Sequence, residues 1–264
     1  RLSEKAQMEW REPFMNKQTT FLTDPNIRAM IGQLQSTMNL RAAMDRGLWV
    51  LINVSKGFLK ENADLLGGLF LAAIWTAALS RADVLDHQGS RALRPWWLYV
   101  DEFQNFTGHD AETILSEAGK YKLVLTLAHQ HLAQLDSKLE ASLMANTAKL
   151  LFRLSHQDTR ALAAELDPRE RLMRLRILPE LQQGEAILKL RGAEPRLLKV
   201  MRVETLDVPE GMIEWVRACS HRHYARPKQQ VLDEIERRQE VILRVAQEIV
   251  EGERRNDGRD GEGW

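Results

Sequence analysis

The sequence has little cysteine and no net charge, and both absences restrict what the protein can be. Its single cysteine, Cys219, cannot form a disulfide within the chain and fits a reducing compartment. Across 264 residues, 37 Lys and Arg side chains balance 37 Asp and Glu side chains. The overall charge therefore neither favours nor excludes nucleic acid, and a polyanion would have to be bound by a local basic patch.

The sequence also lacks a secretory signal and a clear membrane span. Residues 1–10 do not read as a signal peptide. The apolar run 65–80 is shorter than the roughly 20 residues that a spanning helix needs, so we expect a buried core helix there. Because the chain begins with Arg1 rather than Met, we expect a fragment or processed product. We expect a cytoplasmic location, with inner-membrane association only through a region outside this chain.

Continuously apolar runs alternate with helical patterns, which predicts an α/β domain whose parallel sheet is covered by helices on both faces. The expected strands are residues 48–55, 96–100, 123–130 and 149–155. The expected helices are residues 62–82, 110–121, a segment ending near Leu143, and 157–166, with a polar loop at 83–95.

The pattern changes after Pro168. A basic helical segment at 169–181 precedes two adjacent strands, 184–192 and 197–203, that we expect to pair antiparallel. The segment 227–252 predicts an amphipathic helix that docks on the body or on a partner, with its apolar stripe at Val231, Ile235, Ile242, Val245 and Ile249. The expected organisation is a helical lead-in (1–47), an α/β half-domain (48–205), a helical extension (206–252) and a disordered tail (253–264).

Two adjacent acids, Asp101 and Glu102, end the expected strand at 96–100. Burying a carboxylate is costly unless a cation, a substrate or a proton compensates for it. In nucleoside triphosphatases of the RecA-like type, an Asp in this place holds Mg²⁺ through water and the next Glu polarises the attacking water. Ligands bind at the carboxyl ends of parallel strands, where these acids are expected to lie. The same pattern also arises as a simple helix cap.

A polar residue, Gln130, ends the next expected strand. In such enzymes, a residue at this tip senses the γ-phosphate or orients the lytic water, although it also reads as an ordinary polar strand end. We expect the flanking His129 and His131 to be packed or solvated rather than catalytic.

The glycine-rich loop that ends in Gly-Lys-Ser/Thr and cradles phosphates is missing from the sequence. The nearest match, Gly119-Lys120, is followed by Tyr121 and lies within an expected helix. The sequence thus carries the magnesium-and-water half of a nucleotide site without the half that grips phosphate.

Given these residues, the chain resembles the carboxyl-terminal half of the motor domain in the FtsK–HerA superfamily. It is most similar to the TraG/TraD group of conjugative DNA-transfer ATPases, the coupling proteins of type IV secretion. The matching segments, in the family's order over residues 20–205, are DPNIRAMIGQ, LWVLINVSKGFLKENADLLGGLF, WWLYVDEFQNF, ILSEAGKYKLVLTLAHQHLAQL, NTAKLLFRLSHQD and LPELQQGEAILKLRG.

The resemblance implies a RecA-like homo-oligomer, a hexameric ring that hydrolyses ATP with Mg²⁺ at subunit interfaces and pumps DNA through its centre. It gives Asp101 the magnesium-binding role, Glu102 the water-activating role and Gln130 the sensor role. The family's phosphate loop would lie upstream of Arg1. Relatives usually have Arg-Lys-Tyr where this chain has Gly119-Lys120-Tyr121, which puts a trans-acting arginine there in doubt. Arg153 and Lys120 are then the candidates for the interface cation, although each also reads as a structural charge.

The DNA contact is expected on basic side chains of loops that face the pore, through phosphates rather than bases. Lys56 and Lys60, which follow an expected strand, are the candidates, although a solvated loop also explains them. The four arginines of 169–176 could form a phosphate stripe or simply the wet face of a helix. Cys219, His221 and His223 lack a fourth ligand at a recognised spacing, so zinc is not expected.

Three functions remain open from the sequence. The first is the conjugative motor, with secretion or relaxosome proteins as partners. The second is a HerA-type motor that works with a nuclease in DNA processing or defence. The third is a non-catalytic interaction module that cannot bind nucleotide alone.

Overall fold

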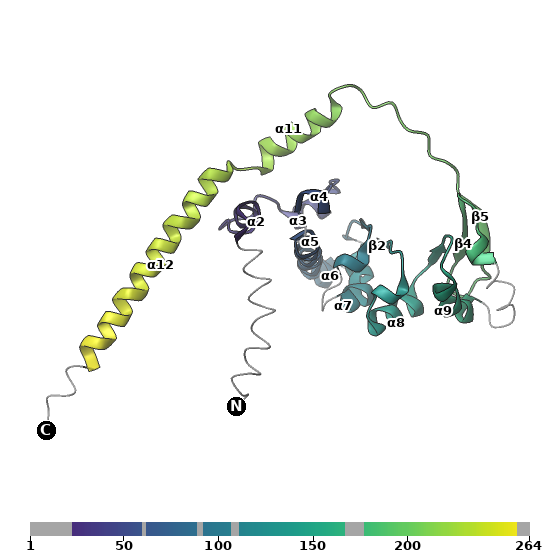
Figure 1. Ribbon diagram of the computed structural model, residues 1–264, viewed down its shortest axis with the longest axis horizontal. Coiled ribbons are helices and arrows are strands. Elements are labelled where there is room, and N and C mark those ends of the chain that lie inside the picture. The colour runs from purple at the N-terminus through teal and green to yellow at the C-terminus, as the bar shows by residue number, and fades with distance from the viewer. Residues whose placement is uncertain (1–22, 60–61, 89–91, 107–110, 167–176, 258–264) are drawn as a thin grey trace. The chain divides into compact units, whose positions relative to one another are not determined.

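The computed structural model describes residues 23–59, 62–88, 92–106, 111–166 and 177–257 (Figure 1). The chain forms two compact units. One comprises Arg1–Asn39 and Val208–Trp264, and the other comprises Leu40–Asp207. Each is described by itself.

The Leu40–Asp207 unit is α/β, as the sequence predicts. The strands β1 (Trp96–Val100) and β2 (Leu123–Leu127) pair in parallel, with Trp96 opposite Leu123 and Val100 opposite Leu127. Both strands lie within predicted strands. Successive side chains along each strand point to opposite faces of the sheet, so alternate residues of β1 and β2 share one face.

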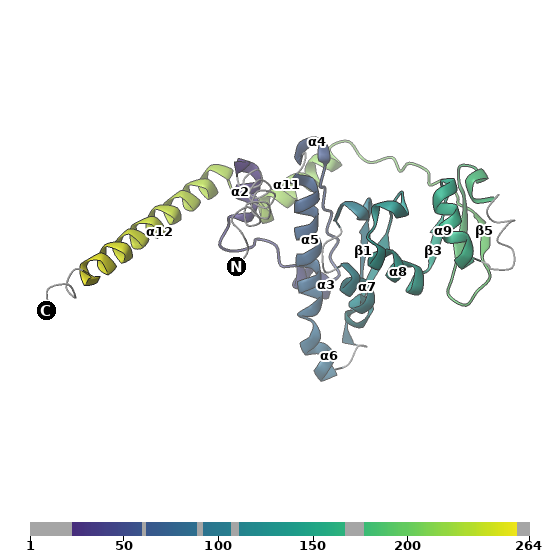
Figure 2. The same ribbon diagram turned by 60° about the horizontal axis from the view of Figure 1, so that its bottom comes forward.

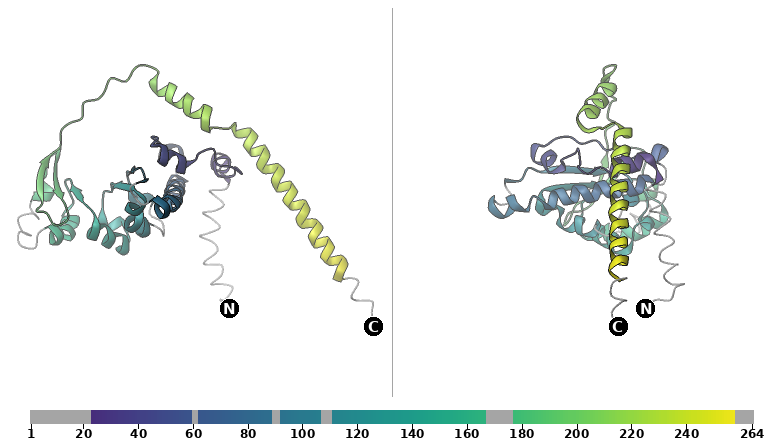
Figure 3. Two further views of the ribbon diagram at one scale, coloured as in Figure 1. Left: turned by 180° about the vertical axis from the view of Figure 1, so that it is seen from behind. Right: turned by 90° about the vertical axis from the view of Figure 1, so that its left-hand side faces the viewer.

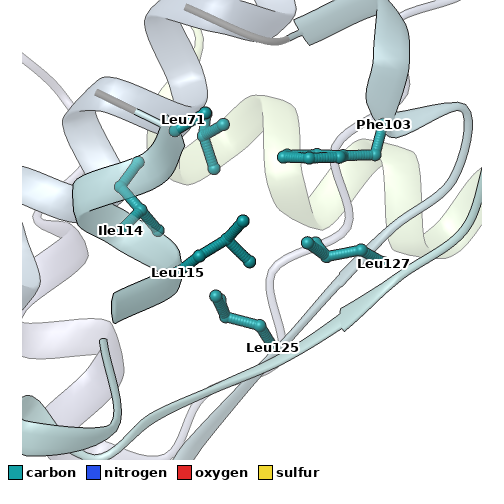
Figure 4. A pocket seen from close by; sticks show the side chains of 7 residues that line it. Leu71, Phe103, Ile114, Leu115, Leu125 and Leu127 are labelled. Atoms are coloured by element: carbon teal, nitrogen blue, oxygen red, sulfur yellow. The ribbon is translucent and has the colours of Figure 1, made fainter. Parts of the chain in front are cut away.

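Helices cover one face of this sheet (Figure 2). The long helix α5 (Asn62–Leu79) and the short helix α7 (Ala111–Glu117) both contribute side chains to it. The apolar residues between them leave no room for a water molecule, and they converge in Figure 4. They are Leu71, Phe103, Ala111, Ile114, Leu115, Leu125 and Leu127.

The second face of the sheet differs from the prediction. Trp97 is 55% exposed and Tyr99 is 71% exposed, so the large aromatic side chains of alternate β1 positions meet solvent. Parallel sheets are ordinarily buried on both faces. The expectation of a sheet covered on both faces is therefore wrong for the described residues, because α5 and α7 lie on the same side.

Helix α5 confirms the predicted helix, but its burial is one-sided. Its buried residues include Leu66, Leu71 and Trp75, whereas Leu65 and Leu69 are exposed. By length and composition alone, Asn62–Leu85 could cross a membrane, and 33% of its most apolar 18-residue window is buried; it is the one such stretch in the described part of the chain. A helix that is apolar all round ordinarily has both sides covered.

Residues 149–155 were predicted to be a further strand of the parallel sheet, and this is wrong. Strand β3 spans only Lys149–Leu151 and pairs antiparallel with β4 (Glu185–Lys189), in a separate sheet. Strand β4 pairs antiparallel with β5 (Arg196–Lys199), which confirms the predicted strand pair. An apolar run defines a strand but not its partner, and β4 and β5 are joined by a short turn that favours antiparallel pairing.

Two other predicted elements are wrong. Residues 48–55 form no strand, and Trp49 is 93% exposed. A strand needs a hydrogen-bonding neighbour as well as an apolar pattern, and residues 48–55 have no ladder partner among the described residues. The predicted loop at 83–95 contains helix α6 (Ala82–Gln88), whose first turn holds Asp83 paired with Arg41 at 2.9 Å. An acid in the first turn stabilises a helix, so its polarity was misread as a loop.

The remaining helices of this unit connect these parts. They are α3 (Leu40–Arg46), α4 (Lys56–Leu59), η2 (Phe103–Phe106), η3 (Ala118–Tyr121), η4 (Leu132–Gln134), α8 (Ser137–Asn146) and α9 (His156–Leu166). The predicted helices near 110–121, before Leu143 and at 157–166 are thereby confirmed in the described residues. Most of the basic segment 169–181 lies outside them.

The other unit contains α2 (Pro25–Ile31), α11 (Met212–Tyr224) and α12 (Lys228–Asp257), the last drawn in yellow in Figure 3. Val231 and Ile235 of α12 pack against Ala29 of α2. A Cβ atom on Gly32 would lie 2.5 Å from the Ile235 side chain, so glycine permits this close contact. The predicted amphipathic helix is confirmed and docks on α2 by its first turns.

The far part of α12 is not covered by any other described residues. Ile242, Val245 and Ile249, which continue the apolar stripe, are exposed. The helix also continues to Asp257, so the predicted boundary at residue 252 is wrong, and residues 258–264 of the predicted tail lie outside the described residues.

Candidate functional site at the carboxyl end of the parallel sheet

The carboxyl ends of β1 and β2 bring two of the predicted site residues together. Glu102 follows β1 and Gln130 follows β2, and the Gln130 side-chain amide donates a hydrogen bond to Oε1 of Glu102. Gln104 donates from Nε2 to the other carboxylate oxygen, Oε2, at 2.5 Å. The carboxylate is therefore held between two amides, one from its own turn and one from the neighbouring strand.

Backbone hydrogen bonds keep these strand ends in register. The N–H of Ala128 donates to the carbonyl of Val100 at 2.9 Å, and the N–H of Phe103 donates to the carbonyl of Ala128 at 2.9 Å. The parallel ladder thus extends past the last strand residues and around the acidic pair. Gln130 lies two residues beyond Ala128, which places its side chain beside Glu102.

Glu102 has an unusual backbone conformation. Its φ is 49°, in the left-handed region that a non-glycine residue occupies at a cost. Asp101 accepts a hydrogen bond from the Glu102 N–H at 3.0 Å and so stabilises the turn. Such residues cluster at functional sites, where the surrounding structure enforces them.

Packing on α5 holds the helical turn that follows the acids. The ring of Phe106, in η2, lies so close to Gly67 that a Cβ atom there would meet it at 2.3 Å. The adjacent Gly68 has open space around its Cβ position. Of the two glycines that interrupt the apolar run, Gly67 therefore has a defined packing role behind the acids.

The acids are less buried than expected for the end of a buried strand. Asp101 is exposed and Glu102 is partly exposed. Among the described residues, neither forms an ion pair. Water can therefore stabilise part of the negative charge of these carboxylates. The sequence had suggested that a cation must neutralise it.

The two carboxylates suit Mg²⁺ by their donor chemistry. This ion is usually bound through one or two carboxylates, with waters and phosphate oxygens completing the octahedron. Asp101 offers exposed oxygens at the end of the turn, whereas both oxygens of Glu102 already accept hydrogen bonds. Within the described residues there is no cluster of three or more His, Cys, Asp or Glu side chains that could enclose a metal by itself.

A second carboxylate, Asp158, lies behind the Gln130 loop. It is only 4% exposed, and it accepts hydrogen bonds from the Ser155 hydroxyl at 2.8 Å and the Leu132 N–H at 3.2 Å. Nδ1 of His131 lies 3.4 Å from its Oδ2. The sequence predicts a helix at 157–166, and Asp158 was given no functional role there. The Ser155-x-x-Asp158 capping pattern was the signal that could have drawn attention to it.

The histidines beside Gln130 are packed or solvated, as expected, and have structural contacts. His129 is partly buried, and burial lowers the pKa of its imidazole while the Asp158 charge opposes that shift. His131 is exposed on its outer side.

Among the described residues, none of the candidate interface or DNA-contacting cations forms an ion pair with Asp101 or Glu102. Lys120 lies in η3, before β2 and hence at the opposite end of the sheet, with its ammonium 6.0 Å from the centroid of the Tyr121 ring. Arg153 is exposed just after β3. Lys56 begins α4 and pairs with Asp64 at 3.0 Å, so it does not lie in a free loop, and Lys60 lies outside the described residues.

The Cys219, His221 and His223 group lies on α11 and shows no convergence. Nδ1 of His223 lies 2.8 Å from the carbonyl oxygen of Cys219, one helical turn earlier. This contact is internal to the helix and forms no part of the site.

We compared the chain with known proteins. No protein-family model matches it, and neither does any curated protein.

Proposed function

We propose that this chain supplies the acid half of a magnesium–ATP hydrolysis site in a DNA-translocating motor of the conjugative coupling type. The observation that carries the proposal is the hydrogen bond between Glu102 and Gln130 at the carboxyl ends of two parallel strands. A RecA-like sheet places its water-activating acid and its sensor at this edge.

In the proposed site, Asp101 would hold Mg²⁺, and the ion would neutralise phosphate charge. Glu102 accepts a proton from the attacking water, and Gln130 orients that water. The hydrogen bond from Gln130 fixes the Glu102 carboxylate at the carboxyl end of the sheet. On substrate binding, the Gln130 amide would donate instead to the attacking water or to a phosphate oxygen, and Glu102 would accept from the attacking water.

The 264 residues contain no Gly-Lys-Ser/Thr loop, so we propose that residues outside them supply the phosphate-gripping half. The 264-residue chain should then show no measurable ATP binding by calorimetry. Micromolar affinity would mean that a phosphate site lies within the chain, contrary to the proposal.

The direct test is the Glu102→Gln variant of the assembled protein. ATP hydrolysis should be stimulated by DNA, and the variant should bind ATP normally while its kcat falls by about 10²- to 10⁴-fold, because only the proton acceptor is lost. Glu112→Gln is the matched control, since Glu112 is an exposed acid in the first turn of α7. Equal turnover in wild type and Glu102→Gln would refute the assignment.

A non-catalytic interaction module is the second candidate. It is favoured by the uncovered sheet face with Trp97 and Tyr99, together with the extended apolar segment 48–55. Contiguous exposed apolar residues mark interaction surfaces. If this candidate is correct, Glu102→Gln should leave partner binding intact. Trp97→Ala should abolish partner binding.

A further inference from the structure

We infer that Asp158 is a positioning residue for Gln130: it anchors the loop after β2 to helix α9 and thereby holds the glutamine against Glu102. This inference rests on the proposed function for its catalytic meaning, but its geometric content stands on the contacts alone.

The first step is the capping arrangement of α9. Ser155 precedes the helix, and its hydroxyl oxygen accepts the Asp158 N–H at 3.1 Å. In the usual capping box, the acid three residues later turns back to the N–H of the cap residue. Here the Asp158 carboxylate instead points out of its helix and accepts from the Leu132 N–H.

The second step is a comparison with two aspartates that do cap helices. Asp24 accepts from Asn26 N–H at 2.7 Å, and Asp136 accepts from Lys138 and Leu139 N–H at 3.0 and 2.9 Å. Both serve the helix that they begin. Among these three aspartates, Asp158 is the one whose carboxylate contacts a segment 26 residues away.

The third step is where that contact lies. Leu132 and His131 directly follow Gln130, and both contact the same carboxylate. On the other side, the loop is fixed by Ala128 in the ladder with Val100 and Phe103. Gln130 thus lies in a short span that is fixed at both ends, once by the sheet and once by Asp158.

The fourth step is burial. Asp158 is 4% exposed, so its carboxylate has little access to water and depends on these donors. Breaking one of them would leave a buried acceptor unsatisfied, which makes the anchor stiff rather than incidental. A stiff anchor is what an orienting residue needs, because small displacements of a catalytic group strongly reduce the rate.

The test follows the side-chain amide signal of Gln130 by ¹H–¹⁵N NMR in the full 264-residue chain. The signal is assigned by its loss in Gln130→Leu, and its shift in Glu102→Gln verifies the contact between the two residues. We expect Asp158→Ala to move it toward the position of a solvated amide. Asp136→Ala, which removes the aspartate that caps α8, should leave it unchanged.

Asp158→Asn keeps the side-chain volume and one acceptor, and it serves if the alanine variant does not fold. It should produce a smaller shift in the same direction, absent from Asp136→Asn. If the Gln130 side-chain amide keeps its wild-type chemical shift in any folded Asp158 variant, the inference is overturned.

The catalytic meaning is tested separately in the assembled protein. Asp158→Asn should lower kcat by about 10- to 100-fold with little change in KM for ATP, since orientation rather than binding is disturbed. A shifted Gln130 signal in a protein without ATPase activity would refute the proposed function and leave the positioning role standing. Normal kcat with an unshifted signal would refute the positioning role alone.

Discussion

The β1–β2 sheet satisfies its polar groups differently at its two ends. At the amino end, the fully buried Arg81 donates to the carbonyl oxygens of Arg94 at 2.6 Å and Tyr121 at 3.1 Å, and it pairs with Asp45 at 3.1 Å. At the carboxyl end, Glu102 contacts two amides and solvent. A buried charge with fixed partners holds the strands together, whereas a partly exposed carboxylate with exchangeable partners is available for chemistry.

The backbone shows the same contrast. Lys122, just before β2, has φ of 56° and ends η3, where a left-handed residue is a common helix cap. Glu102, just after β1, has φ of 49° without ending a helix. Strain at the amino end is therefore explained by local structure, and strain at the carboxyl end supports a functional explanation.

The largest expected effect is the loss of Arg81. In Arg81→Met, one buried and one partly buried carbonyl lose their donor, and the free energy of unfolding should fall by about 2–4 kcal/mol, measured by urea denaturation. Arg41 also pairs with Asp45 but is partly exposed, so Arg41→Met should cost about 1 kcal/mol or less. Equal losses in the two variants would remove the distinction between a buried anchor and a surface pair.

The second effect concerns the packing that supports the carboxyl end. Gly67→Ala would drive a methyl group into the Phe106 ring, and overpacking of this kind costs about 1–3 kcal/mol. In the adjacent control, Gly68→Ala, the methyl group enters open space and should stabilise the helix by about 0.5–1 kcal/mol. Thermal unfolding should thus move in opposite directions for these neighbours. Shifts of the same sign would contradict the close contact at Gly67.

The third effect is small by design. The double variant Asp101→Asn, Glu102→Gln should change the free energy of unfolding by less than about 0.5 kcal/mol, because both side chains reach solvent and keep their size. A loss comparable with that of Arg81→Met would mean that the acids hold the fold together. In that case, the comparison between the two sheet ends would fail.

The smallest effect is a pH dependence at His129. Burial lowers the pKa of this imidazole below its unfolded value of about 6.5. The unfolded chain then binds a proton first as the pH falls, so the stabilising contribution is present above that value and is lost toward the lowered pKa. His129→Gln should flatten this part of the stability profile between pH 7.5 and 5.5. An unchanged slope would show that other groups cause it.

Much of the parallel sheet was predictable, and so was the place of the acids. The runs WWLYV and LVLTL are apolar, end in polar residues and flank a helical segment, which is sufficient to predict parallel strands with Glu102 and Gln130 at one edge. Partner choice was not predictable in the same way. Residues 48–55 and 149–155 have equally apolar patterns, yet one forms no strand and the other pairs antiparallel. An apolar run indicates that a segment tends to be buried. Whether it pairs as a strand, and with which partner, depends on which other segments lie beside it in the fold.

Asp158 illustrates the other limit. The pattern Ser155-x-x-Asp158 predicts a capping box, and Ser155 does cap α9, but the Asp158 carboxylate contacts Leu132 and so joins segments that are distant in the chain. Sequence patterns within one segment do not predict a contact between two distant segments. The role of an aspartate in the first turn of a helix therefore depends on which groups its carboxylate oxygens contact in the folded structure.

The left-handed backbone of Glu102 makes two separate demands on that position, and a saturation library would separate them. Folding should tolerate Gly and Asn best, because these residues enter the left-handed region most readily, and should reject Val and Ile, whose branched side chains do not. Catalysis should accept only a carboxylate. Selection for expression and selection for activity would therefore enrich different residues at position 102.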